Sequence, residues 1–279
     1  MSLDKVVPDI AAAVADIASG SSLAVGGFGL AGIPWFLIEA LLEQGADDLT
    51  VVSNNCGVDG AGLGLLLEQG RISRVIASYV GENKEFARRY LAGELTVELT
   101  PQGTLAERLR AGGAGLGAFY TPTGVCTLVA EGGIPWRYHT DGTVALTSPP
   151  KEVRTFQGRE MALEEAIVTD VALVRAAVTD CAGNCVFHAS ARNFNPAAAM
   201  AGRLTIVEAE QVVEVGELGP DEVHLPGVFV QRVVPLTPEQ AARKDIEKRT
   251  VRGARPHLQP PAGEAGGKHR ATVPTRGGN

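Results

Sequence analysis

Two segments of this chain carry residue types that can act on an anion or a carbonyl group, and the first is a glycine-rich bend. Its residues are Gly26, Gly27, Phe28, Gly29, Gly32 and Pro34. Glycine permits a positive φ and lets a ligand approach the backbone, and a helix that starts just after such a bend directs free N–H groups at an anion. A tight strand-to-helix turn without a ligand is the alternative interpretation.

The second segment is the polar sequence that begins at Asn54. It follows the β-branched run Leu49–Ser53, which has the length and composition of a buried strand. The carboxyl ends of parallel strands are where open α/β sheets bind ligands, so Asn54 is a candidate site residue. The alternative is an Asx-turn that only closes the strand.

The cysteines give a weaker signal. Cys181 and Cys185 form a C-x3-C pair, but the chain has no second pair, and His188 alone does not complete a zinc site. The residues between Asp180 and Asn184 are typical of a hairpin turn. We therefore predict reduced thiols and no bound metal.

Composition and charge narrow the class of protein. With 279 residues, 45% of them hydrophobic, the chain can build a substantial core. A formal net charge of −7 argues against a nucleic-acid binder, since phosphate contacts need clustered lysine and arginine. No apolar run is long enough to span a membrane and no signal peptide precedes the first helix, so we expect a cytoplasmic protein that acts on small molecules.

Strands and helices of similar size alternate through the first part of the chain. The predicted helices are 6–18, 35–43, 61–69, 84–90 and one beginning after Thr104, and the predicted strands are 23–25, 49–53, 74–80, 95–99, 170–174 and 204–210, the last continued by 211–216. This order predicts a parallel sheet with helices on both faces.

Other local patterns give further predictions. Thr104 and Glu107 have the spacing of a capping box that would start the fifth helix. From Tyr120 to Gly158, short runs broken by Pro, Gly and Asp predict an excursion of small strands that covers one end of the sheet or meets a partner. Residues 253–279 are rich in Gly, Pro and basic residues, which predicts a disordered basic tail; contact with RNA or an acidic partner is the alternative to a dispensable extension.

Several motifs, taken in order, together resemble one family. These motifs are Gly26–Pro34, Ser53–Asn55, Ser78–Lys84, Glu98–Arg108, Ala111–Gly115 and Ser190–Asn195. They resemble the alpha subunit of family I CoA-transferases, closest to the 3-oxoacid type that moves CoA from succinyl-CoA to acetoacetate or a related acid. The resemblance runs from about Val6 to Val251, so that residues 1–252 would form the alpha-subunit domain. Where the family has Asp or Asn followed by Gly before the first strand, this chain has Ser19 and Gly20.

The resemblance implies an open, mostly parallel α/β sheet with helices on both faces plus a smaller antiparallel portion. It also implies a partner. The family's nucleophilic glutamate lies in a Ser-Glu-Asn-Gly sequence of the beta subunit, and this chain has no such sequence. Glu82 is the alternative nucleophile, but it matches a segment proper to the alpha half. The implied enzyme is a heterotetramer of alpha and beta subunits that takes coenzyme A as a substrate, with acyl-CoA and carboxylic acids, and holds no tightly bound cofactor.

The resemblance also assigns roles to three residues. The Asn54 position supplies a backbone N–H to the oxyanion of the thioester reaction, where each preorganised donor contributes about 3 kcal/mol. Gln102 matches a position that faces the remote carboxylate of the acid substrate; its alternative is a hydrogen bond within the turn from Thr100 to Gly103. Tyr79 lines the same pocket, and a packed core tyrosine is its alternative.

Competing functions remain open at this point. A sugar-phosphate isomerase or deaminase could use the bend to hold phosphate, although Gly26–Pro34 contains no Lys or Arg. A non-catalytic module that binds CoA or a nucleotide needs only the bend. Among transferases, acetoacetate is the preferred acceptor, with 3-oxoadipate and short-chain fatty acids as alternatives.

Overall fold

A computed structural model describes residues 4–246 of the chain. Its centre is a seven-stranded sheet in the order β15-β13-β10-β1-β2-β3-β4. Every neighbouring pair in this sheet is parallel. The strands are β1 (Ser22–Val25), β2 (Leu49–Val52), β3 (Ile72–Ala77), β4 (Thr96–Leu99), β10 (Thr169–Ala176), β13 (Gly202–Ala209) and β15 (Arg232–Pro235). The predicted parallel sheet is confirmed.

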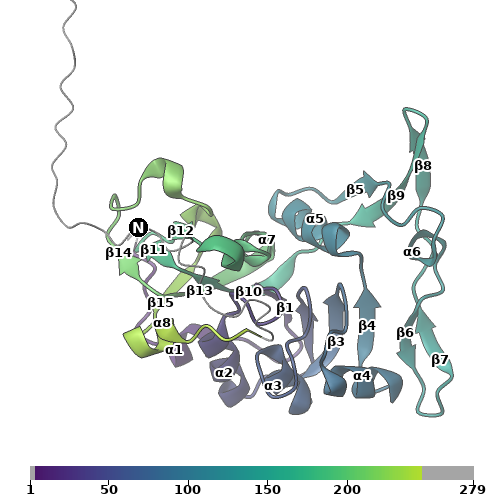
Figure 1. The fold of residues 1–279 in the computed structure, drawn as a ribbon, viewed down its shortest axis with the longest axis horizontal. Coiled ribbons are helices and arrows are strands. Elements are labelled where there is room, and N and C mark those ends of the chain that lie inside the picture. Colours follow the sequence, from purple (N-terminus) through teal and green to yellow (C-terminus); the bar gives the residue numbers. More distant parts are fainter. Residues whose placement is uncertain (1–3, 247–279) are drawn as a thin grey trace, which may run out of the picture. The chain divides into compact units, whose positions relative to one another are not determined.

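Helices cover both faces of the sheet (Figure 1). They are α1 (Ile10–Val14), α2 (Trp35–Gln44), α3 (Leu63–Glu68), α4 (Lys84–Leu91), α5 (Gln102–Gly113), α6 (Leu128–Glu131), α7 (Asn195–Ala201) and α8 (Pro238–Ala242), with 3₁₀ turns η1 (Ala189–Arg192), η2 (Pro220–Glu222) and η3 (Gly227–Phe229). Helices α1 to α4 share one apolar core with Leu23 and Val25, whereas α5 and α7 share the other with Ala24. This division follows from the alternation of side chains along a strand.

Three predicted segments of the sheet region differ from the structure. The strand predicted at 74–80 is β3 and ends at Ala77, so Ser78 and Tyr79 follow it. The first helix runs only from Ile10 to Val14, with Asp9 as its N-cap. It starts late because the preceding residues are extended along β15, where Val6 forms a parallel bridge with Val233. The segment after β13 does not extend that strand: β14 (Val212–Val213) pairs with β11 (Val178–Asp180) in a separate sheet. In that sheet β11 and β12 (Cys185–Val186) form an antiparallel hairpin, which confirms the turn predicted around the two cysteines.

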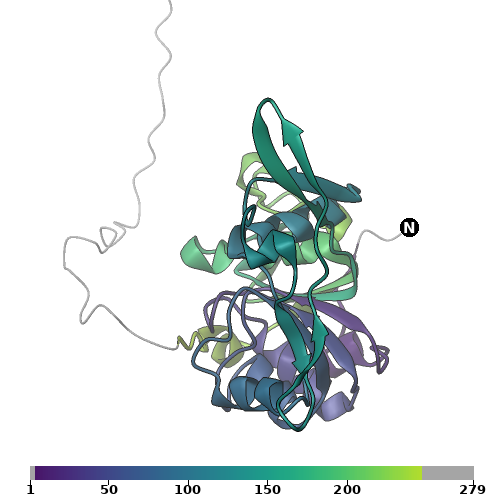
Figure 2. The same ribbon diagram turned by 90° about the vertical axis from the view of Figure 1, so that its right-hand side faces the viewer.

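The excursion between α5 and β10 is confirmed as a set of small antiparallel strands. Strands β5 (Ala118–Thr121), β9 (Arg159–Glu165) and β8 (Val153–Phe156) form one sheet, and β6 (Pro135–Tyr138) and β7 (Val144–Thr147) form a hairpin. Figure 2 shows this excursion from the front. The hairpin lies beside β4, the outer strand of the large sheet, which β6 contacts. Arg74 of the next strand, β3, lies over the ring of Trp136 at 5.7 Å. The proposed tail at 253–279, and its boundary at 252, lie outside the described residues.

Candidate active site

Three consecutive strand ends bring polar side chains together at one edge of the sheet. Asn54 follows β2, Ser78 follows β3, and Gln102 is the first residue of α5, which follows β4. Strands β2, β3 and β4 are parallel neighbours, so their carboxyl ends lie side by side. The sequence predicted this edge for Asn54, and the family resemblance placed Gln102 in the same pocket; the structure adds Ser78.

Asn54 is fully buried, and its side chain is bonded across strands. Its Oδ1 accepts hydrogen bonds from Ser78 Oγ at 2.9 Å and from Gln102 Nε2 at 3.1 Å. Its backbone oxygen accepts from the backbone N–H of Ser78 at 2.9 Å. The Asx-turn alternative is therefore wrong for this residue, because Oδ1 is used by residues of two other strand ends.

Two donors of Asn54 have no partner within residues 4–246. The side-chain Nδ2 is buried and forms no hydrogen bond. The backbone N–H forms none either, whereas the N–H groups of Ser53 and Ser78 each bond to a backbone oxygen. A buried donor without a partner costs about 1–3 kcal/mol, so such groups call for an explanation.

Gln102 begins α5, and this start differs from the prediction. Pro101 is the N-cap, and Thr104 lies buried in the first turn with no partner for its Oγ1 among the described residues. The capping box of Thr104 and Glu107 is therefore wrong: proline at the N-cap starts the helix three residues earlier, and this places Thr104 against the core. Gln102 is exposed and donates to Asn54 rather than to the turn from Thr100 to Gly103.

Tyr79 follows Ser78 and is 39% exposed, so the core alternative is wrong. Its ring lies close to Gly81, where an added Cβ would lie 3.1 Å from Tyr79 Cε2. Glu82 is also exposed and precedes Asn83, the N-cap of α4. Tyr79 and Glu82 therefore lie on the surface loop that leaves the same edge of the sheet.

The glycine-rich bend is packed against the protein itself. Phe28 and Ala31 exchange two backbone hydrogen bonds, which closes a tight turn. A Cβ at Gly26 would overlap the side chain of Asn195, and one at Gly32 would lie 2.9 Å from Ala191. Gly27 adopts φ +107°, which other residues rarely do. Protein atoms fill the space beside Gly26 and Gly32 that a phosphate would need, so the structure favours the turn over the phosphate cradle.

Three asparagines hold this bend in place. The N–H of Gly29 donates to Asn55 Oδ1 at 2.9 Å, which joins the bend to the end of β2. Asn195 Nδ2 donates to Gly32 O at 2.9 Å and Asn193 Nδ2 to Ala31 O at 3.0 Å. The bend therefore fixes the position of the segment that carries Asn54.

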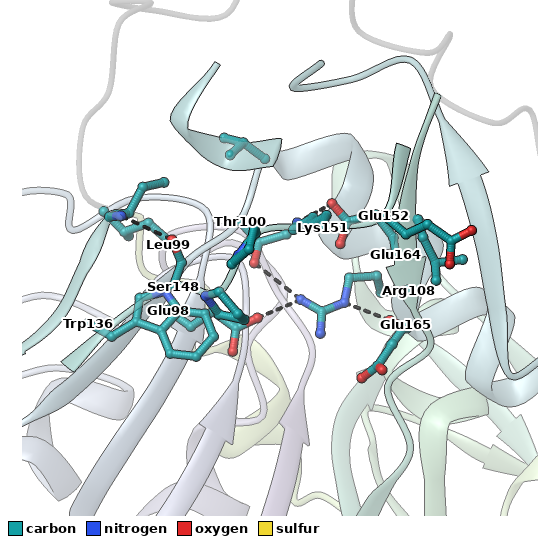
Figure 3. Close-up of a pocket in the computed structure, with 15 residues that line it drawn as sticks. Glu98, Leu99, Thr100, Arg108, Trp136, Ser148, Lys151, Glu152, Glu164 and Glu165 are labelled. Carbon is teal, nitrogen blue, oxygen red and sulfur yellow. Dashed lines mark hydrogen bonds and ion pairs between the residues drawn. The ribbon is translucent and has the colours of Figure 1, made fainter. Parts of the chain in front are cut away.

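A cavity of about 240 Å³, lined by both charged and apolar side chains, lies between β4, α5 and the excursion (Figure 3). Glu98 accepts from Arg74 and Arg108 at 2.7 Å each, and Lys151 pairs with the buried Glu164. Burial would raise the pKa of Glu98, but the charge of Arg108 and the hydrogen bonds from both arginines lower it overall. Glu98 and Arg108 belong to one of the sequence motifs, but the sequence analysis gave them no role. The signal that could have indicated this ion pair is the presence of opposite charges in β4 and in the helix that follows it.

A second cavity, of about 190 Å³, lies next to β1 and β10, where the order in which strands are added to the sheet reverses. Arg175 at the end of β10 donates to Glu208 at 3.3 Å, and Glu208 Oε2 accepts the N–H groups of Phe36 and Leu37 at the start of α2. Burial raises the pKa of Glu208 to about 7, against the charge of Arg175 and these two N–H bonds. These contacts fix α2, and with it the end of the bend.

Two further observations on residues 4–246 bear on the class of protein. No group of three or more His, Cys, Asp or Glu side chains is placed to hold a metal ion there. Within the same residues, no helix combines the length and apolar content needed to cross a bilayer. The fold and the site define an open α/β protein whose polar cluster lies at the carboxyl edge of a parallel sheet, built from neutral amide and hydroxyl groups.

The chain belongs to the Coenzyme A transferase family, whose model matches residues 7–236. It is 63% identical over 250 residues to a probable succinyl-CoA:3-ketoacid coenzyme A transferase subunit of Mycobacterium tuberculosis, covering 90% of this chain and 100% of that protein. It is 53% identical over 238 residues to the mitochondrial succinyl-CoA:3-ketoacid coenzyme A transferase 2 of Homo sapiens, covering 85% of this chain and 46% of the human one.

A solved structure confirms the fold. The acyl-CoA transferase of Escherichia coli O157:H7 superposes with a TM-score of 0.71 at 22% identity, covering 88% of this chain and 50% of that one. This chain therefore spans about half the length of that enzyme and of the human relative. The family resemblance predicted from the sequence motifs is confirmed.

Proposed function

We propose that this chain is the alpha subunit of an enzyme that moves CoA from succinyl-CoA to a 3-oxo acid, with acetoacetate as the preferred acceptor. The substrate assignment rests on the names of relatives such as the Mycobacterium tuberculosis protein. The observation that carries the site assignment is the buried Asn54, whose N–H and Nδ2 have no partner within the described residues. The enzyme uses coenzyme A as a substrate and no tightly bound cofactor.

The partner supplies the nucleophile. This chain lacks the Ser-Glu-Asn-Gly sequence, and its candidate site consists of neutral donors. In the beta subunit, a glutamate carboxylate attacks the thioester carbonyl of succinyl-CoA and expels the CoA thiolate, which leaves a mixed anhydride. The thiolate then attacks the glutamyl carbonyl, releases succinate and forms the glutamyl-CoA thioester. The acceptor acid reverses these two steps. Two copies of each subunit form the complex.

The residues of this chain stabilise the carbonyl oxygen that becomes negative and bind the acid substrate. Each attack makes a carbonyl oxygen negative, and the backbone N–H of Asn54 donates to it beside a donor of the beta subunit. Gln102 and Tyr79, both exposed at the same edge, contact the acid. Gln102 binds its remote carboxylate with a neutral amide, which allows the product to leave.

The first experiment tests the division of the site between two chains. The purified chain alone is expected to show no transferase activity, and mixing it with its beta subunit should give succinyl-CoA-dependent formation of acetoacetyl-CoA. A panel with acetoacetate, 3-oxoadipate and short-chain fatty acids then identifies the acceptor. Activity of the isolated chain would overturn the proposal that the nucleophile belongs to the partner.

A pair of variants tests the backbone donor. Asn54→Ala keeps the N–H and removes the side chain, whereas Asn54→Pro removes both. In assembled complexes, the proline variant should have a kcat about 10²-fold or more below that of the alanine variant, since one oxyanion donor is lost. Equal kcat values for the two would count against the role of the backbone N–H.

A further inference from the structure

The orientation of the Asn54 side chain is set by its two neighbours. Gln102 Nε2 can only donate, so its contact of 3.1 Å places the oxygen of the Asn54 amide on the side of Gln102 and Ser78. The nitrogen therefore points to the opposite side, where it has no partner within residues 4–246. Ser78 and Gln102 thus hold the Asn54 amide so that its N–H₂ group points to a side where the described residues offer no acceptor.

The missing partner has a definite chemistry. An amide N–H₂ only donates, so the group it meets is an oxygen acceptor, and leaving this donor unpaired costs about 1–3 kcal/mol in the chain alone. The backbone N–H of the same residue is also without a partner in the described chain. Two donors on one residue suit an oxygen that becomes negative during the reaction, since such an oxygen accepts more than one hydrogen bond.

We propose that the side-chain Nδ2 of Asn54 is a second hydrogen-bond donor to the acyl oxygen in the transition states of CoA transfer, and that Ser78 and Gln102 orient it. This inference rests on the proposed function. Ser78 is a positioning residue: its N–H bonds the backbone oxygen of Asn54, and its Oγ contacts both that oxygen and Oδ1 at 2.9 Å. The resemblance assigned only the backbone of Asn54, so the side chain adds a donor.

Gln102 links the oriented amide to the acid. Of the two side chains bonded to Asn54, that of Gln102 is the exposed one. Its Nε2 carries two N–H groups, so one can donate to Asn54 Oδ1 while the other donates to the carboxylate of the acid. Gln102 therefore keeps the Asn54 amide oriented while the acid is bound.

The test compares two variants of Asn54 in the assembled complex of alpha and beta chains. Asn54→Asp has nearly the shape of asparagine and keeps an acceptor oxygen for Ser78 and Gln102, but it replaces the donor with an oxygen. Asn54→Ala removes the side chain and leaves a void. If Nδ2 donates to the oxyanion, kcat falls about 10²-fold for the alanine variant and further for the aspartate variant, whose oxygen repels the developing charge. KM should change less than kcat in both.

A structural role predicts the reverse order. The aspartate variant would then be the milder one, because it preserves the packing and both contacts to Oδ1. A kcat for Asn54→Asp equal to or above that of Asn54→Ala overturns the inference, and so does an alanine variant within about threefold of wild type. Absence of transferase activity in the wild-type complex would instead overturn the proposed function, so the two failures are distinguishable.

Asn83→Asp is the matched control. Asn83 is buried at the start of α4, accepts the N–H of Phe86 at 2.8 Å and donates to Cys56 O at 2.8 Å. The aspartate keeps the helix cap and loses the donor, which is the same chemical change at a residue that forms no hydrogen bond to Asn54, Ser78 or Gln102 within residues 4–246. Its complex should unfold at a lower temperature and keep kcat within about twofold. A loss of kcat as large as that of Asn54→Asp would overturn the inference.

Discussion

Replacing Gly26 by alanine tests why the bend needs glycine there. A Cβ at Gly26 would overlap Asn195 Oδ1 and lie 2.7 Å from its Cγ. Unlike Gly27, Gly26 has no positive φ, so the alanine backbone itself is unstrained. The whole cost therefore comes from displacing Asn195, and no ligand contact is needed to explain the glycine.

The magnitude follows from the contacts that Asn195 makes. Its Oδ1 accepts the N–H of Arg175 at 3.2 Å, and its Nδ2 donates to Gly32 O and Ala191 O at 2.9 and 2.8 Å. Three hydrogen bonds at about 1 kcal/mol each amount to about 3 kcal/mol of stability. Gly26→Ala and Asn195→Ala should each lower the free energy of unfolding by about this amount, since each loses the same three bonds.

The double variant is decisive. With Asn195→Ala in place the overlap with the side chain is gone, and a contact of 3.1 Å with the Cα of residue 195 remains. Adding Gly26→Ala should then cost less than about 1 kcal/mol, which gives a coupling energy of about 2–3 kcal/mol between the two positions. Urea denaturation of the full chain, followed by circular dichroism, measures all four proteins. Additive losses, about twice the single loss of about 3 kcal/mol, would refute the explanation. In the assembled enzyme, a double variant that is as stable as Asn195→Ala but less active than it would indicate that Gly26 also contacts a ligand.

Two further predictions concern single buried groups. Because the pKa of Glu208 is raised from 4.5 to about 7, the native state binds its proton more tightly than the unfolded state, and its contribution to stability falls by roughly 3 kcal/mol as the pH rises through this range. Glu208→Gln removes this pH dependence. The free energy of unfolding of wild type minus that of the variant should therefore decrease between about pH 5 and pH 8 in urea titrations. A difference that stays constant over this range would contradict the raised pKa. Thr104→Val replaces a buried hydroxyl without a partner in the described chain, so it should leave stability unchanged or raise it by up to about 1 kcal/mol in the same assay; a loss of about 1 kcal/mol would instead support the rejected helix cap.

Local patterns predicted most of the elements, because period and composition are properties of neighbouring residues. The strand at Leu23–Val25, the helix at Trp35 and the hairpin near Asp180 all lie where the sequence placed them. The capping box at Thr104 failed although its spacing was correct. Pro101 starts α5 earlier, and the packing of the first turn on the sheet decides which of two competing starts is used.

The sequence by itself determined the family, the parallel α/β class and the candidacy of Asn54, since motifs and the strand-turn-helix order are readable along the chain. Only the tertiary structure decided what Asn54 contacts. Ser78 and Gln102 reach it because β2, β3 and β4 are adjacent in the sheet, and strand order is not written in any local pattern. The same holds for the bend, where Gly26 is glycine because Asn195, brought by a distant helix, occupies the space beside it.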